Sequence, residues 1–513
     1  MSTVALLQMY VVDMCMYFRD ITTLGKAGVV FLASASLLTF LHRLTYRNKA
    51  IPGPWGLPVV GHLPFLGKTP FLTFMKMRKI YGDLIKLQFG SWPTVVIHGK
   101  LIKEALSTKG DAFSGRPQFF SSVSVQNGKS LSFGKFDISW KLHRRIANKS
   151  FQAFTNARSN PIEEIIHEEV SYILEEFERY NGGAFDPHDH IYIAMGSVVY
   201  QICYGRKGNV RADKDFCEYI LHTQDFSTFV TAGNPVDIFP WLRHFMKKRI
   251  NKFKDLLSKG HLIRRKRIQD HLETFSSDYL RDITDSLINE SRQLTEEDKA
   301  NGMSEERIQD TIGDLFAAGF DTVATTTMWT LLLLAKTPRV QKKIQEELDS
   351  VVGMSRRPTL GDRRNLVYTE ATIHEILRII NLTPLSLPHA TTEDVELAGY
   401  TIKKDTLVLL NLFSLSHDKE VWGDPEVFRP ERFLKDDGQI DTRLVDMYLP
   451  FSAGRRRCMG EILARTELFL IISGFLQRCT FVKPKDVQKY TMECSFGLNM
   501  KPLPYKVEIR NRN

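Results

Sequence analysis

Ten residues near the C-terminus, 451–460, combine one cysteine with glycines and arginines. They read F-S-A-G-R-R-R-C-M-G, and the apolar segment that follows directly, roughly 461–476, predicts a helix. The neighbouring arginines and the N-terminus of that helix both favour the anionic form of Cys458. Gly454 and Gly460 let the backbone and a flat ligand approach closely, and Phe451 can pack under such a ligand. Each part of the segment thus has a physical role if Cys458 is a thiolate ligand.

The spacing F-x-x-G-x-R-x-C-x-G is that of the haem loop of the cytochrome P-450 family, and the chain resembles that family at every motif position. The resemblance implies haem b with Cys458 as the axial thiolate, and such a ligand favours O–O cleavage. A free cysteine in the core is the alternative, because cysteine is often simply buried. Five matched positions speak against it.

A second motif, 317–322 (A-A-G-F-D-T), lies inside residues 304–336, which predict a long helix. Glycine inside a helix costs about 1 kcal/mol relative to alanine, so Gly319 needs a reason. Small residues there leave room for haem and O₂, and threonine can bond back to its helix and loosen it. The resemblance implies that Thr322 steadies bound oxygen and that Asp321 relays protons to it. Two ordinary helix residues are the alternative.

A third pattern, E-x-x-R, places Glu375 and Arg378 on one face of a predicted helix, where they can pair. Alone this pattern is common. In the family the pair braces the core behind the haem and joins an arginine of a later loop. Here that loop is 428–433, with Arg432 at the matching position. All three residues are expected to be structural.

A fourth pattern, W-x-x-x-R, puts two residues one helical turn apart, and arginine binds carboxylates well. Haem propionates are carboxylates. The resemblance therefore gives four propionate contacts: Trp140, Arg144, His389 and Arg456.

Further basic residues, Lys141, Arg145, Arg455 and Arg457, are candidates for a face that receives an acidic electron-donor protein. The resemblance implies NADPH-cytochrome P-450 reductase as that donor, with cytochrome b5 as a second candidate. Association through such a face would be sensitive to salt.

The bulk composition is that of a globular protein with room for a sizeable core: 513 residues, 43% hydrophobic and 25% charged. The six cysteines show no CxxC pair, so neither a zinc site nor a disulfide framework is indicated, and a reducing compartment is expected. A net charge of +10 suits an anionic membrane or an acidic protein partner, because no nucleic-acid module is recognisable.

Near the N-terminus, Leu24 to Leu44 is mostly apolar and has about the roughly 20 residues that a spanning helix needs. Arg43, Arg47 and Lys49 follow, so the positive-inside rule places the rest of the chain in the cytosol. A cleaved signal peptide and a buried core helix are the alternatives. We expect a membrane anchor and an endoplasmic reticulum location.

A stiff connector, 51–58 (I-P-G-P-W-G-L-P), comes next, because proline excludes helix. Such hinges follow the anchor in microsomal members of the family. The predicted domains are accordingly 1–48, the anchor with its basic flank, and 49–513, the haem-binding monooxygenase domain.

The expected fold class is mainly α with small β-sheets, the cytochrome P-450 fold, preceded by the anchor helix. Residues 84–89 and 94–97 predict a strand pair around a G-S-W-P turn. Local matches look closest to the vertebrate family-1, aryl-hydrocarbon-type members, with the steroid 17α-hydroxylase branch as rival. By analogy with family 1, a flat pocket would be lined by Phe133, Phe226, Ala318, Gly319 and Leu498.

The resemblance implies a monooxygenase that inserts one atom of O₂ into an apolar substrate, which is a planar aromatic, a steroid or a fatty acid. Electrons would come from NADPH through the reductase, since no nucleotide-binding motif appears in strand–turn–helix context. Rival hypotheses are a haem-thiolate isomerase or dehydratase, a non-catalytic haem sensor or carrier, and a haem-free membrane scaffold. The pair Asp321 and Thr322 argues against the first, because such enzymes need no oxygen-activating pair.

Overall fold

The computed structural model describes residues 50–155, 162–205, 210–222, 226, 229–230 and 234–512. The predicted anchor, 1–48, lies outside these ranges. Within them, no helix combines the length and the apolar character that crossing a membrane requires.

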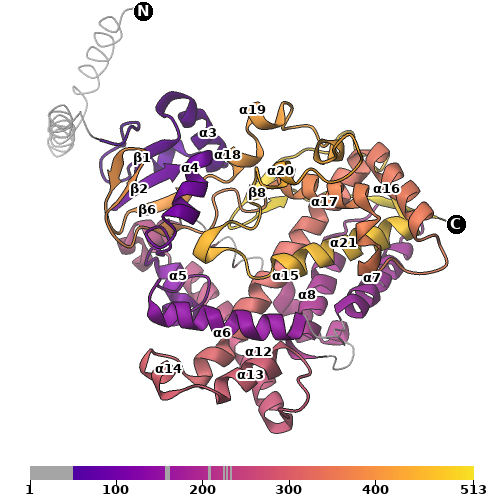
Figure 1. The fold of residues 1–513 in the computed structure, drawn as a ribbon, viewed down its shortest axis with the longest axis horizontal. Helices are drawn as coiled ribbons and strands as arrows, with labels where there is room; N and C mark the ends of the chain where they lie inside the picture. Colours follow the sequence, from indigo (N-terminus) through magenta and orange to yellow (C-terminus); the bar gives the residue numbers. More distant parts are fainter. Residues whose placement is uncertain are drawn as a thin grey trace, which may run out of the picture.

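The fold is mainly helical, as predicted, and strands β1, β2 and β6 lie together at one side (Figure 1). The longer helices are α3 (Pro70–Tyr81), α6 (Ile138–Thr155), α7 (Ile162–Glu178), α8 (His188–Tyr204), α9 (Lys214–His222), α12 (Lys247–Thr274), α13 (Ile283–Arg292), α15 (Glu305–Lys336), α16 (Pro338–Val351), α17 (Val367–Ile380) and α21 (Glu461–Arg478). Short helices are α4 (Lys100–Lys103), α5 (Phe120–Ser124), α11 (Pro235–Ile238), α14 (Glu296–Ala300), α18 (Phe413–Ser416), α19 (Lys419–Trp422) and α20 (Thr442–Val445).

The largest sheet of the described residues has the strand order β1-β2-β6-β3. Its strands are β1 (Leu84–Phe89), β2 (Trp92–Ile97), β3 (His389–Ala390) and β6 (Leu407–Leu410). The expected pair 84–89 and 94–97 is confirmed, and β2 begins two residues earlier. Pro93 is tolerated there because the parallel pairing with β6 begins only at Thr94.

Three two-stranded sheets complete the β structure of the described chain. They pair β4 (Val395–Leu397) with β5 (Tyr400–Ile402), β7 (Cys479–Val482) with β10 (Glu508–Asn511), and β8 (Cys494–Phe496) with β9 (Met500–Pro502). The β8–β9 hairpin contacts the middle of α15, which makes it part of the site described below.

Helix α15 runs through the middle of the molecule and packs on α8, α13, α17 and α21 (Figure 1). Ser304 caps its N-terminus, accepting the backbone N–H of Arg307 at 3.1 Å. From Val323 to Ala335 every side chain is buried, so the hydrophobic effect fixes this half of the helix in the core. The preceding turns carry the A-G-F-D-T motif.

Candidate active site

The cysteine loop folds into a tight turn in front of α21. The Cys458 N–H donates to the Phe451 carbonyl at 3.0 Å, and residues 454–456 form a short 3-10 turn. Gly454 has a φ of +69°, and a Cβ there would stand 1.9 Å from the Leu106 carbonyl oxygen. Glycine is thus required twice at this position, by its backbone conformation and by the close approach of residue 106.

Replacing Gly454 by alanine should lower the free energy of unfolding by about 2–5 kcal/mol, the sum of a left-handed alanine and a forced backbone shift. Gly438 is the matched control, because it has a φ of +79° but open space around its Cβ position. Gly438→Ala should cost only about 1–2 kcal/mol. Denaturant titrations of both variants measure the difference. Equal costs would contradict the role assigned to the contact with residue 106.

Cys458 is the one exposed cysteine in the described chain. Crowding by surrounding protein raises the pKa of its thiol, while the backbone N–H of Gly460 and the guanidinium groups of Arg144 and Arg457 lower it. A thiol that is accessible yet surrounded by protein faces an interior space and not the open surface. A metal ion beside it would deprotonate it outright.

The middle of α15 is unusually open for a central helix. Ala317 and Ala318 are exposed, although the helix is buried from Val323 onward. The Thr322 hydroxyl donates to the Ala318 carbonyl at 2.9 Å, the back-bond that the sequence suggested. The small residues of the motif therefore do leave room beside the helix.

Asp321 lies one residue before this threonine and has close partners. Lys501 Nζ donates to its Oδ1 at 2.7 Å, and Asn499 Nδ2 donates to its Oδ2 at 2.7 Å. Both partners come from the β8–β9 hairpin. Sequence reasoning missed them, because no local pattern links residues about 180 positions apart.

Arg456 and Trp140, two of the expected propionate contacts, lie together. The guanidinium of Arg456 stacks over the Trp140 ring at 3.8 Å from its centroid. It donates to the carbonyls of Ser114, Leu131 and Gly134 at 2.7–3.0 Å. Burial, with the positive charges of Arg116 and Arg144 nearby, lowers the pKa of Arg456 to about 8.

His389 and Arg144, the other two expected contacts, lie in the same region. His389 is buried and donates from Nδ1 to the Phe113 carbonyl at 2.7 Å. Burial, with Arg116 and Arg456 nearby, lowers its pKa well below the usual value. Arg144 donates to the Arg457 carbonyl. The structure thus brings all four expected contacts to one region.

Arg116 is a member of this group that the sequence reasoning missed. It is buried and donates to the carbonyls of Ser132, Leu387 and Pro388 at 2.8–3.1 Å, and burial lowers its pKa to about 9. Its place in the segment 113–117, F-S-G-R-P, was the available signal. In the described chain, none of Arg116, Arg144 and Arg456 forms an ion pair with Asp or Glu. Buried charges are normally paired, so this donor set fits an anionic ligand such as the two haem propionates.

The residues expected to line a substrate pocket lie in two places. Phe133 and Phe226 belong to one apolar cluster, in which Phe226 lies 6.0 Å from Phe253. Leu498 is half-buried at the tip of the β8–β9 hairpin. The Cβ position of Gly319 lies 3.2 Å from a methyl of Val199, so close packing of α8 accounts for glycine there. The pocket assignment remains a prediction.

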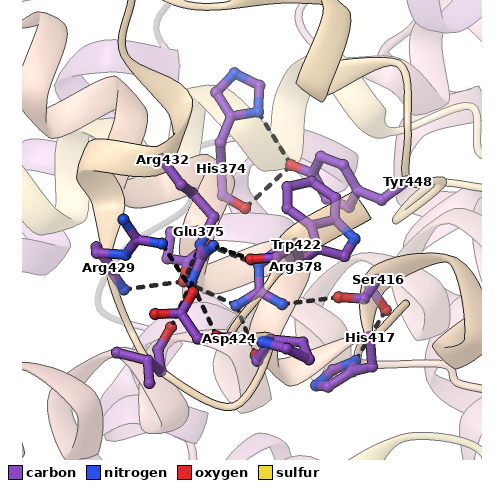
Figure 2. A network of polar contacts seen from close by, with 12 residues as sticks. His374, Glu375, Arg378, Ser416, His417, Trp422, Asp424, Arg429, Arg432 and Tyr448 are labelled. Atoms are coloured by element: carbon purple, nitrogen blue, oxygen red, sulfur yellow. Dashed lines mark hydrogen bonds and ion pairs between the residues drawn. The ribbon is translucent and has the colours of Figure 1, made fainter. Parts of the chain in front are cut away.

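Glu375, Arg378 and Arg432 form a buried network (Figure 2). The Arg378 guanidinium donates to both Glu375 oxygens at 2.7 and 2.8 Å, and Arg432 Nε donates to Glu375 Oε1 at 3.1 Å. Arg378 also holds the carbonyls of Ser416 and Pro425 at 2.7 and 2.9 Å. The network ties α17 to the long loop that leads to Cys458.

A basic recess of about 1150 Å³ opens between α6 and the cysteine loop. Three of the four residues expected on the donor face line it: Lys141, Arg145 and Arg455, with Lys149 as an addition that the sequence reasoning missed. Asp111 accepts Arg455 at 2.7 Å and Lys141 at 3.2 Å. All these basic side chains remain exposed, so they can meet an acidic partner.

Comparison with known proteins agrees with this geometry. The family model for cytochrome P450 matches residues 51–509. Cytochrome P450 1A1 of Macaca fascicularis is 39% identical over 462 residues, 88% of this chain and 90% of the relative. The Homo sapiens cytochrome P450 1A1 is 38% identical over 462 residues, and cytochrome P450 1A2 of Rattus norvegicus is 38% identical over 465 residues, both with the same coverage. The chain therefore belongs to the cytochrome P450 family, as a monooxygenase whose haem iron takes a cysteine thiolate.

Proposed function

We propose that Cys458 is the axial thiolate and that the enzyme inserts one atom of O₂ into an apolar, planar aromatic substrate. The observation that carries this is the accessible thiol of Cys458 in the same region as the buried Arg116 and Arg456 and the half-buried Arg144. Among the described residues, none of these arginines forms an ion pair with Asp or Glu. Bound haem supplies oxygen activation and transfer of one oxygen atom. Arg116, Arg144, Arg456, Trp140 and His389 would hold its propionates.

In this proposal the residues of α15 handle oxygen and protons. Ala317 and Ala318 leave space beside the helix, and the Thr322 hydroxyl, oriented by its bond to the Ala318 carbonyl, keeps lone pairs free to accept a proton. Asp321 takes a proton from water and passes it toward Thr322, then returns to the carboxylate. Proton delivery of this kind typically contributes a factor of about 10²–10⁴ to a rate.

For the substrate class, the cluster around Phe133, Phe226 and Phe229 supports planar aromatics, since aromatic rings stack on flat molecules. A narrow cleft adjoins this cluster, with Phe119, Phe133, Val230 and Pro388 on its apolar side and Arg116, Ser121 and Ser122 on its polar side. The relatives named cytochrome P450 1A1 and 1A2 support the same choice over the steroid 17α-hydroxylase branch. Fatty acids and steroids remain the comparison substrates for the test.

The test is the difference spectrum of the reduced protein with and without carbon monoxide, followed by titration with planar aromatics, steroids and fatty acids. A thiolate-type Soret band, with shifts caused by planar aromatics at the lowest concentrations, is the expected result. Steroid shifts at lower concentrations would move the substrate to the rival branch. A folded protein without the band would overturn the proposal.

We further propose that the enzyme is anchored in the endoplasmic reticulum membrane, faces the cytosol, and takes electrons from NADPH-cytochrome P450 reductase at the basic recess. The exposed charges of Lys141, Arg145, Lys149 and Arg455 support this docking. Cytochrome b5 is a second acidic partner for the same face.

Arg145→Glu should raise the KM for the reductase about two- to fivefold per exposed charge pair lost, with kcat retained. Arg145 suits this test because its side chain is 75% exposed. Its ion pair with Asp298 is long, at 3.8 Å. Lys266→Glu on α12, outside the recess, is the control. Reconstituted turnover at several reductase and salt concentrations measures both. An unchanged KM for Arg145→Glu at low salt would contradict docking at the recess.

A further inference from the structure

The β8–β9 hairpin holds the Asp321 carboxylate by both oxygens. Lys501 on β9 and Asn499 at the turn each donate at 2.7 Å, to Oδ1 and Oδ2 respectively. Asn499 is buried, and the side chains of Lys501 and Asp321 are 17% and 13% exposed. A pair so shielded is screened little by salt, and its geometry is fixed at both ends.

Tyr192 on α8 closes the third side of this carboxylate. Its hydroxyl lies 2.8 Å from the Thr325 hydroxyl, and Lys501 Nζ lies 5.2 Å from its ring centroid. Burial and the nearby charge of Asp321 raise the pKa of Tyr192, so it remains a neutral hydroxyl. The carboxylate therefore has one cation and two neutral polar neighbours.

The same hairpin carries Leu498, the residue expected to contact substrate. Leu498 directly precedes Asn499 in the turn between the strands. The backbone of Met500 anchors the hairpin through two hydrogen bonds. The Met500 N–H donates to the Leu382 carbonyl at 2.8 Å, and the Met500 carbonyl accepts from Trp329 Nε1 of α15 at 2.8 Å. The strand backbone is thus fixed at Met500, between Asn499 and Lys501 and two residues from Leu498.

We propose that Asn499 and Lys501 are positioning residues for Asp321, and that the β8–β9 hairpin couples substrate contact at Leu498 to proton delivery. The inference rests on the proposed function, because it assumes that Asp321 relays protons. Lys501 holds the Asp321 carboxylate in one orientation, so that each proton it takes from water is passed on in one direction. Asn499 fixes which oxygen faces Lys501 and which faces the turn.

A purely structural alternative is that the pair only staples the hairpin to α15. Both roles predict some loss of stability when Lys501 is replaced. They differ in how electrons are used: without ordered proton delivery, two electrons and two protons convert O₂ to H₂O₂ and no product forms. If the pair served only to attach the hairpin to α15, the ratio of H₂O₂ to product in the folded fraction would be unchanged.

The experiment compares Lys501→Met, Lys501→Arg, Asn499→Ala and Asp321→Asn, with Lys506→Met as an exposed matched control on the same segment. Readouts are H₂O₂ and product per NADPH, the solvent isotope effect on kcat, and the C–O stretch of the reduced carbon monoxide complex. The last reports the electrostatic field at the site independently of turnover. Thermal unfolding of each variant identifies losses that come from folding alone.

We expect Lys501→Met and Asn499→Ala to shift electrons toward H₂O₂ about tenfold, to change the solvent isotope effect, and to move the C–O stretch. Lys501→Arg should restore most of the coupling, and Lys506→Met should match the wild type. If Lys501→Met does not fold, the H₂O₂ yield and the C–O stretch of Asn499→Ala test the proposal in its place.

Two outcomes separate the inference from the proposal beneath it. Wild-type coupling in Asp321→Asn would overturn the relay role of Asp321, and the inference with it. A strong effect in Asp321→Asn together with wild-type coupling and C–O stretch in the Lys501 and Asn499 variants would overturn the inference alone.

Discussion

Replacing Cys458 by serine should abolish the thiolate-type Soret band and monooxygenase turnover while leaving a folded protein. A serine hydroxyl has almost the same volume but does not supply the soft anionic sulfur that pushes electron density toward the iron. Cys458 is exposed, and serine fits where cysteine does, so the substitution should not disturb the core. Difference spectra with carbon monoxide, product formation and far-UV circular dichroism of the same preparation measure the three expectations.

A second cysteine supplies the control for this substitution. Cys217 on α9 is half-buried and donates to the Arg211 carbonyl at 3.3 Å. Cys217→Ser should keep the band, because its sulfur lies on another element and takes no part in the loop. A thiolate band that survives in Cys458→Ser would assign the ligand to another cysteine and contradict the proposed site.

Much of the helical frame could be predicted from local sequence. Ser304 followed by an acidic first turn predicts the start of α15. The expected helix 304–336 is observed as Glu305–Lys336. The helix expected after the cysteine loop, 461–476, is observed as Glu461–Arg478. These elements have capping residues and apolar stretches within one segment, so their signals do not depend on the rest of the fold.

The parts that could not be predicted depend on contacts between distant segments. Arg116, the Asp321–Lys501 pair and the recess residue Lys149 are examples, because each gains its role only when other elements fold against it. Gly319 was expected to make room for a ligand. Packing gives it a second role, because its missing side chain also allows Val199 of α8 to pack closely against it. Local patterns identify residue types suited to a task, whereas packing decides which neighbours each one has.

The choice between branches of the family also needed more than local motifs. Segments of the chain resembled both family-1 members and the steroid 17α-hydroxylase branch. Identities of 38–39% to cytochrome P450 1A1 and 1A2 across 88% of the chain favour the first. The family also settles the reaction type in favour of a monooxygenase over an isomerase, a sensor or a scaffold.

Glu375→Gln should destabilise the protein by about 3–5 kcal/mol, which is a large share of the stability of a typical domain. Glutamine keeps the shape and one acceptor oxygen but removes the charge that compensates two buried guanidinium groups. Arg378 is fully buried and Arg432 is 4% exposed, so neither can recover the lost interaction from water. The midpoint and slope of denaturant unfolding, followed by circular dichroism, give the change in free energy.

The matched control is Glu346→Gln on α16, where an exposed glutamate lies 3.7 Å from Lys342 one turn earlier. Such surface pairs contribute about 0.3–0.5 kcal/mol, so this variant should unfold within that margin of the wild type. A difference between the two variants of several kcal/mol would show that burial, not pairing alone, makes Glu375 essential. Glu375→Gln within 1 kcal/mol of the wild type would mean that the loop leading to Cys458 is held by its many backbone bonds to Arg378 and Arg432 without help from the carboxylate.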